Sequence, residues 1–279
     1  MPQLKVIIPD DIDPESISPE LRKYLANDRH LTIPHDRVHV TDVTVGLRET
    51  YLKYTTDFVE TLDDRMAVAP QSLYHAALEI NSPDTSTFSH GNLIGSVDDW
   101  EADAKEMRIY DFKFVGAYKV KLMLGLDKHT EPILDEEGNK IMWRGKPRVN
   151  TSFLPTLIPD LSPYDDQMNI YRGLMREEGF CADRKIRCFL NVVPRDAGTV
   201  AGRMHGVTKR FYSIEIPDNK TAIEQAHIRA DELLEAFATK TPPPPCLSVH
   251  SWEGRKCRQY CAVANACANL CDNQWFDEE

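Results

Sequence analysis

Residues 98–113 place two carboxylates and a lysine near the ends of two β-prone runs. The runs cover 93–97 and 108–115 and flank an acidic turn at 101–106, which predicts two adjacent antiparallel strands. Because side chains alternate along a strand, Asp111 and Lys113 share one face. Asp98 ends the first run and can reach the same face. The opposite face of the second run is aromatic and carries Tyr110, Phe112 and Phe114.

This trio of charged side chains has a chemical use. Carboxylate oxygens are the ligands that Mg²⁺ and Mn²⁺ prefer. A lysine beside them can orient or help deprotonate a water, and it can offset charge in a phosphoryl-transfer transition state. A solvated surface pair between Asp111 and Lys113 would produce the same triplet, so the pattern by itself leaves both interpretations open.

Two predicted helices carry further polar pairs. In the helix expected at 69–80, His75 and Glu79 are four residues apart and face the same way. In the helix expected at 161–178, Gln167 and Tyr171 have the same spacing. An amide and a phenol so placed can hydrogen-bond a phosphate or fix the surroundings of an attacking water. Surface pairs, or a core tyrosine with a polar neighbour, would also give these spacings.

These segments resemble the ordered motifs of the PD-(D/E)xK nuclease superfamily. The run from Gly95 to Asp98, followed by Asp111-x-Lys113, resembles the superfamily core, and Gln167-x3-Tyr171 resembles the Q-x-x-x-Y motif of the RecB-like branch. The stretch His-Ala-Ala-Leu-Glu at 75–79 and the segment 38–52 resemble two upstream motifs of that branch. The C-terminal cysteines resemble those of the iron–sulfur members, such as CRISPR-associated RecB-like exonucleases and the exonuclease V group. The five segments cover about residues 38–267.

The resemblance implies an α/β fold with a restriction-endonuclease-like core, a central mixed sheet flanked by helices, and a cysteine-ligated C-terminal lobe. It also implies that one or two Mg²⁺ or Mn²⁺ ions are held by Asp98, Asp111, His75 and the Phe112 carbonyl, with Glu79 as a further ligand or its support. In the same pattern Lys113 positions the attacking water, while Gln167 and Tyr171 arrange the nucleic-acid strand.

The implied activity is metal-dependent DNA cleavage, commonly exonucleolytic on single strands or duplex ends, in recombination, repair or phage replication. Three alternatives stay open. A structure-selective or restriction-like endonuclease would keep the same residues. A DNA-binding protein with a decayed nuclease core would bind without cleaving. A zinc-stapled interaction module would leave the pattern of Asp98, Asp111 and Lys113 unexplained.

The cysteines predict a second metal site. None of the seven precedes Cys181, and five lie between Cys246 and Cys271. Thiolates gathered so closely favour a soft metal, and a [4Fe–4S] cluster or a Zn²⁺ ion takes four. Our ligand set is Cys246, Cys257, Cys261 and Cys267, with Cys271 in reserve. By the resemblance the first cluster cysteine would fall near Gly46, where this chain has none, so Cys246 is expected to replace it. Free or disulfide-bonded cysteines are the alternative.

Charge and composition limit the classes of protein to which this chain can belong. A net charge of −11 disfavours a general nucleic-acid coat protein but allows a nuclease that contacts DNA in a groove. The candidate contact is the run 140–148, which contains four cations and Trp143 and no acid; a solvated hairpin edge is the alternative. The start of the chain lacks a signal-peptide pattern and no run reaches membrane-spanning length. These features predict a soluble protein of the cytoplasm, that of the host cell if the protein is viral.

The expected organisation has three parts. Residues 1–36 form an N-terminal extension, 37–240 the nuclease core, and 241–279 a proline spacer followed by the cysteine-rich lobe. Within the core, hydrophobic periodicity predicts a helix at 42–62, an elaborated hairpin within 119–148, strands at 186–194 and 211–216, and a helix at 221–237.

Overall fold

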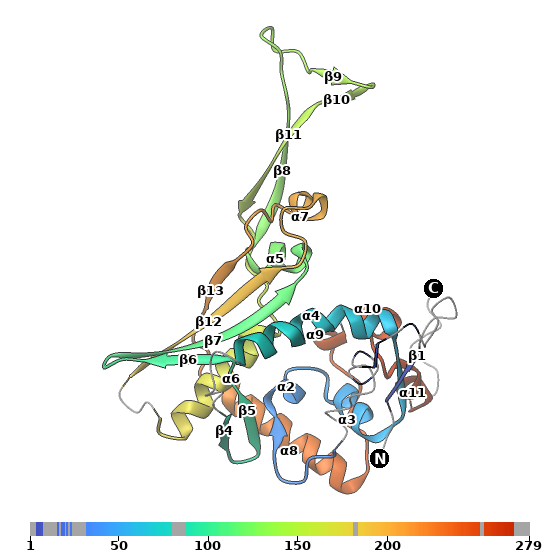
Figure 1. Cartoon of the computed structure of the whole chain (residues 1–279), viewed down its shortest axis with the longest axis vertical. Coiled ribbons are helices and arrows are strands. Elements are labelled where there is room, and N and C mark those ends of the chain that lie inside the picture. The colour runs from blue at the N-terminus through green and yellow to red at the C-terminus, as the bar shows by residue number, and fades with distance from the viewer. Residues whose placement is uncertain are drawn as a thin grey trace.

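The computed structural model describes residues 4–7, 16, 18, 19, 21, 23, 32–79, 87–180, 184–251 and 254–270. A four-stranded mixed sheet forms its centre, in the order β13 (Tyr212–Ile216), β12 (Lys185–Pro194), β7 (Glu106–Val115) and β6 (Asp99–Ala102). The two long central strands run parallel over ten residue pairs, and both edge strands are antiparallel to their neighbours. Figure 1 shows this sheet crossing the middle of the molecule.

Helices pack on this sheet. Helix α6 (Tyr164–Glu177) lies against β12, and α8 (Ala222–Thr239) lies on the outer side of α6. Residues 167–175 of α6 are buried without interruption, as expected of a helix enclosed on two sides. Gly173 permits the close approach, because a Cβ there would collide with Ile223 of α8. A third helix, α4 (Leu62–Glu79), packs along β7 (Figure 1).

A smaller unit completes the body. Strands β2 (Val38–His39), β5 (Leu93–Ser96) and β4 (Thr87–His90) form a second sheet, beside which α2 (Val40–Val43) and α3 (Leu47–Thr55) pack. Strands β1 (Leu4–Ile7) and β3 (Phe58–Thr61) form a parallel pair. Three short C-terminal helices, α9 (Ser248–Ser251), α10 (Arg255–Gln259) and α11 (Ala264–Leu270), cover the far end, where α11 contacts α3.

A long arm projects from this body. After α5 (Ala117–Met123), strands β8 (Leu126–Pro132) and β11 (Val149–Pro155) pair antiparallel over seven residues. The arm ends in a second hairpin of β9 (Met142–Trp143) and β10 (Lys146–Pro147), well away from the other elements (Figure 1). Helix α7 (Val200–Met204) lies at its base.

The α/β class, the mixed sheet and the flanking helices confirm the sequence prediction at that level. The elements predicted at 161–178, 186–194, 211–216 and 221–237 are found as α6, β12, β13 and α8. The aromatic face of β7 is also found, since Tyr110 stacks on Phe189 with ring centroids 5.7 Å apart.

Three local predictions are wrong. The runs at 93–97 and 108–115 are not adjacent strands: β5 belongs to the smaller sheet, and β7 pairs instead with β6, whose last two residues fall in the turn predicted at 101–106. The helix predicted at 42–62 is interrupted, because Gly46 caps a new helix and 58–61 leaves the helix to pair with β1. Helix α4 begins at Leu62 rather than at 69 and contains Pro70. In the segment 42–62, strand pairing of 58–61 with the distant β1 overrode local periodicity.

Candidate active site

The candidate site lies at an open edge of β7. Strand β6 pairs with β7 only as far as Tyr110, so the next backbone groups on that edge lack a strand partner. Side chains form hydrogen bonds with these backbone groups instead. Asp98 accepts a hydrogen bond from the Phe112 amide at 2.7 Å, and Gln71 of α4 donates to the Phe112 carbonyl at 2.7 Å and accepts from the Phe114 amide. This edge therefore holds Asp98 at a defined place between β5 and β6.

Asp111 and Lys113 lie on the more buried face of β7. The Lys113 Nζ is 2.7 Å from Asp111 Oδ2, and the two side chains are 14% and 4% exposed. The solvated-pair interpretation therefore does not describe this structure. Burial by itself would lower the pKa of Lys113, but the charges of Asp111 and Asp98 outweigh it and raise the pKa. Lys113 is thus a cation held between two carboxylates.

Helix α6 brings a tyrosine and a glutamine behind the carboxylates. Gln167 donates a hydrogen bond to the Tyr171 hydroxyl at 2.9 Å, and both side chains are buried. Burial raises the pKa of Tyr171, and the negative charges of Asp111 and Asp98 raise it further. A Cβ at Gly95 would lie 2.6 Å from Tyr171 Cε1, so the glycine of β5 makes room for the ring. The spacing read from the sequence therefore corresponds to a real contact beside Asp98 and Asp111.

Two side chains of the site were missed by the sequence reasoning. The Tyr164 ring lies under the Lys113 ammonium, 5.3 Å from the ring centroid, and burial raises the pKa of its phenol. Tyr164 precedes Tyr171 by seven residues, two turns of α6, and this spacing was a usable signal. Gln71 precedes His75 by four residues and so shares its helix face.

The remaining predicted metal ligands lie on or beside these elements. His75 and Glu79 belong to the last turns of α4, one and two turns beyond Gln71, but their side chains lie outside the described part of the chain. The Phe112 carbonyl keeps a second lone pair beside its bond to Gln71. Among the described side chains, no three of His, Cys, Asp or Glu are grouped closely enough to hold a metal. Asp98 and Asp111 fit a hard dication as a pair of oxygen donors.

The four cysteines of the predicted set lie in the C-terminal lobe. Cys246 occupies the place expected of it: a Cβ added to Gly46 would collide with the Cys246 sulfur. Burial raises the pKa of Cys257, with the nearby Cys246 adding to the shift, and burial raises that of Cys261 to about 11. None of the four forms a disulfide within the described residues, and they match a four-thiolate site in number and kind. They do not match it in arrangement, since no three of the described thiols are grouped as ligands. Cys181 and Cys271 lie outside the described residues.

Ion pairs fasten this lobe to α3. Arg48 donates to the Pro243 carbonyl at 2.6 Å, which ties the proline spacer to the start of α3. Glu49, 6% exposed, pairs with Lys53 and with Lys256, the neighbour of Cys257. Burial by itself would raise the pKa of Glu49, but the two ammonium groups outweigh burial and lower it. The lobe is therefore docked on a buried carboxylate.

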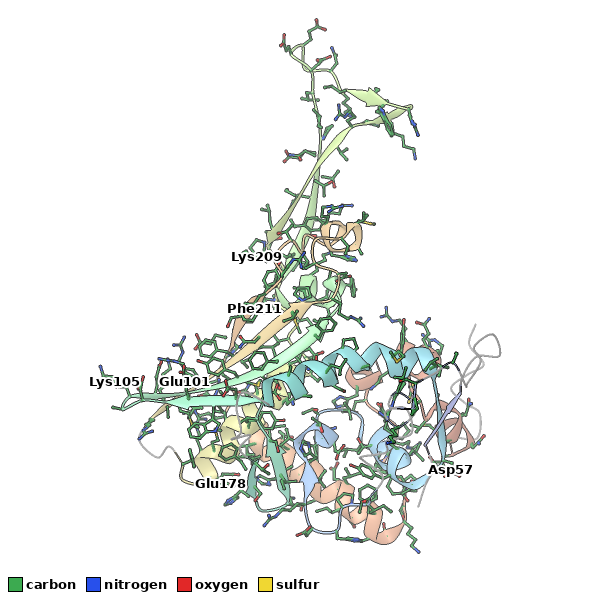
Figure 2. All side chains as sticks on the ribbon, viewed as in Figure 1. Asp57, Glu101, Lys105, Glu178, Lys209 and Phe211 are labelled. Atoms are coloured by element: carbon green, nitrogen blue, oxygen red, sulfur yellow. The ribbon has the colours of Figure 1, made fainter. Side chains whose placement is uncertain are left out.

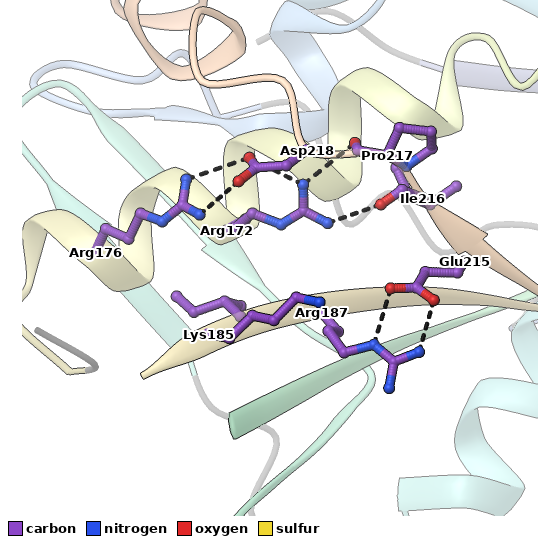
Figure 3. Close-up of a pocket in the computed structure, with 9 residues that line it drawn as sticks. Arg172, Arg176, Lys185, Arg187, Glu215, Ile216, Pro217 and Asp218 are labelled. Atoms are coloured by element: carbon purple, nitrogen blue, oxygen red, sulfur yellow. Dashed lines mark hydrogen bonds and ion pairs between the residues drawn. The ribbon is translucent and has the colours of Figure 1, made fainter. Parts of the chain in front are cut away.

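A pocket of about 460 Å³ lies between α6 and the strands β12 and β13 (Figure 3). Two of its arginines are paired with carboxylates: Arg187 binds Glu215 through two hydrogen bonds of 2.8 and 2.6 Å, and Arg176 pairs with Asp218 at 2.8 Å. The buried Arg172 donates to the Ile216 carbonyl at 2.9 Å and so fastens α6 to the end of β13. This network positions α6, the helix that carries the tyrosines of the candidate site.

Comparison of the chain with protein-family models, curated proteins and solved structures finds no significant match. No helix in the described residues combines the length and the apolar composition needed to cross a membrane.

Proposed function

We propose that this protein is a metal-dependent DNA nuclease of the PD-(D/E)xK type, acting as an exonuclease on single strands or DNA ends. One observation carries the proposal: Asp98, Asp111 and Lys113 converge on one largely buried patch at the open edge of β7. Two carboxylates and one ammonium leave this patch with a net negative charge. Burying such a charge is costly unless a cation neutralises it, which favours a divalent metal there.

Each residue has a role that follows from its position. Asp98, Asp111 and the Phe112 carbonyl would hold Mg²⁺ or Mn²⁺, with His75 and Glu79 of α4 as further candidate ligands. The bound ion would supply Lewis-acid chemistry for phosphodiester hydrolysis. The Lys113 ammonium orients the attacking water and offsets negative charge on the phosphate.

Three side chains of α6, Tyr164, Gln167 and Tyr171, support the charged residues of the site. Tyr171 and Gln167 are buried and bonded to each other, so we assign them the positioning of the carboxylates rather than direct contact with DNA. Tyr164 holds the Lys113 ammonium over its ring, where the cation–π attraction restricts the lysine.

The test is an assay on linear and circular DNA, single- and double-stranded, with Mg²⁺, Mn²⁺ or EDTA. We expect cleavage of linear DNA that requires the metal. Asp111→Ala and Lys113→Ala should each lower the rate about a hundredfold or more. Lys105→Ala is the matched control, because Lys105 is exposed at the β6–β7 turn (Figure 2) and should leave the rate unchanged. Cutting of circles would identify an endonuclease. Binding without cleavage under every metal would identify a decayed nuclease core, and retained activity in both variants would refute the mechanism.

We also propose that the C-terminal lobe takes a [4Fe–4S] cluster, or Zn²⁺ in its place, through Cys246, Cys257, Cys261 and Cys267, and that binding draws these thiols closer together than they lie among the described residues. The resemblance expects a ligand cysteine near Gly46, where this chain has none. Cys246 lies against Gly46, which supports Cys246 as the ligand in that place. Such a site would contribute folding energy to the lobe and no chemical step. Iron and zinc analysis of anaerobically purified protein tests it. Cys257→Ser should lower the metal content, whereas Cys188→Ser, in the buried core, should not. An unchanged content in Cys257→Ser would refute the assignment.

A further inference from the structure

The hairpin at the tip of the arm has an unusual turn. Arg144 and Gly145 have φ angles of 49° and 76°, the left-handed values of a two-residue type I′ turn. A left-handed backbone is uncommon for a residue other than glycine and costs about 1 kcal/mol or more. In this conformation the Arg144 guanidinium lies over the Trp143 ring, 4.4 Å from its centroid.

One face of this hairpin gathers the ring and the cations. Trp143 pairs with Lys146 across the strands, so both side chains lie on the same face. Arg148 lies two residues beyond Lys146 and therefore on that face as well. Arg144 is thus stacked on the Trp143 ring, and two further cations share the face of the hairpin that carries the ring. We name this set, Trp143, Arg144, Lys146 and Arg148, the tip patch.

The tip patch is exposed and uncompensated. Trp143 is 62% exposed, although tryptophan is among the side chains that gain most from burial. No acidic residue occurs from Gly138 to Pro159. Within the described residues, none of the three cations of the patch forms an ion pair. The acids of this end of the arm, Asp135, Glu136 and Glu137, lie in the turn that precedes Lys140, so the positive charge is confined to the hairpin that follows.

Cations continue from the candidate active site towards the arm. Arg195 follows the end of β12, where its amide donates to the Val115 carbonyl at 2.9 Å, just beyond Lys113 on the neighbouring strand. Exposed Arg203, Lys209 and Arg210 follow in the segment between β12 and β13, and Lys209 and Phe211 lie near the base of the arm (Figure 2). The arm rests on this segment, because a Cβ at Gly206 would collide with the Phe153 ring of β11.

We propose that the tip patch is a second DNA-binding site, which holds single-stranded DNA at a distance from the cleavage site. Cations contact phosphates and an exposed aromatic ring stacks on an unpaired base, a combination that binds single strands with little dependence on sequence. The proposal rests on the proposed nuclease function for the choice of DNA as the ligand. A protein partner would use the same tryptophan and arginine, but the line of cations back to the active site favours a polyanion.

The length of the arm sets the distance between the two sites. The β8–β11 ladder has seven residue pairs and is therefore about 20 Å long. At about 3.4 Å per nucleotide this corresponds to at least about six nucleotides between the two sites. A strand shorter than that can occupy the active site alone, whereas one of thirty nucleotides reaches both.

Binding of fluorescent single strands of about four and about thirty nucleotides by the full chain, in EDTA to prevent cleavage, tests the proposal. Trp143→Ala should weaken binding of the long strand about tenfold and leave the short strand unchanged. The triple variant Arg144→Ala/Lys146→Ala/Arg148→Ala removes three phosphate contacts. Because each contact contributes about 0.7, the plot of log binding constant against log salt concentration for the long strand should become less steep by about 2. Met142→Ala, on the opposite face of the hairpin, is the matched control and should behave as the parent protein.

The outcomes separate the two proposals. Unchanged binding of the long strand by the tip-patch variants would overturn the second site, and so would an equal loss on both strands, because the effect would then not depend on reach. A parent protein that binds the long strand through the tip patch but cleaves no DNA would refute the nuclease and leave the second site standing. A parent protein that binds no DNA would overturn both.

Discussion

Replacing Lys113 by methionine removes the ammonium that lies 2.7 Å from Asp111 and keeps a side chain of similar length. At that distance and an effective dielectric constant of about 20, the gross attraction is roughly 6 kcal/mol. Desolvation of the two ions offsets part of it, and removing one partner of a buried pair typically costs 3–5 kcal/mol. We therefore expect Lys113→Met to lower the free energy of unfolding by about 3 kcal/mol, because Asp111, 2% exposed, is left beside Asp98 without its cation.

A double-mutant cycle isolates the pair. Asp111→Asn/Lys113→Met removes both charges, so its loss should be about 2 kcal/mol smaller than the sum of the two single losses. Lys105→Met, at an exposed position, should change stability by less than about 0.5 kcal/mol. The measurement is urea unfolding in EDTA, with all variants showing the same m value.

Adding MgCl₂ to the same variants tests whether Asp111 is a metal ligand. If Asp98 and Asp111 bind the metal, MgCl₂ should raise the Tm of Lys113→Met more than that of Asp111→Asn/Lys113→Met, since only the single variant keeps both carboxylates. If each single variant loses less than about 1 kcal/mol of unfolding free energy and the two losses are additive in the double variant, the stabilising pair of Asp111 and Lys113 is refuted. An equal Mg²⁺ effect on the two variants would refute Asp111 as a ligand.

Three further predictions concern other contacts of the structure. Gly95→Ala places a Cβ 2.6 Å from the Tyr171 ring, so we expect a loss of about 1–3 kcal/mol in urea unfolding and a fall in nuclease activity; parent-like values for both would contradict this contact. The lowered pKa of Glu49 stabilises the folded state above the unfolded value of 4.5 and ceases to do so as pH falls through the folded value. The hydrogen-exchange protection factors around Lys256 should therefore fall below about pH 4.5, and Glu49→Gln should remove this pH dependence; persistence of the dependence in that variant would exclude Glu49 as its source. Cys246→Ser should lower bound iron or zinc as far as Cys257→Ser does, and a full metal content would exclude it as a ligand.

Local sequence patterns determined much of the candidate site. Alternation along 108–115 was enough to put Asp111 and Lys113 on one face, and helical spacing was enough to join Gln167 to Tyr171. Both relations depend on residues within four positions of each other, where backbone geometry fixes which side chains meet. The central elements α6, β12, β13 and α8 followed from periodicity for the same reason.

Only the tertiary structure decided how the distant parts meet. No local pattern shows that β5 leaves the sheet of β7, that Gln71 completes the open edge at Phe112, or that the Cys246 sulfur fills the space beside Gly46, two hundred residues away in the chain. The direction of the arm is also set by tertiary packing, because it depends on how Phe153 packs against Gly206. Such contacts are selected by burial and strand pairing over the whole chain, because the free energy that favours them is gained only when remote segments come together.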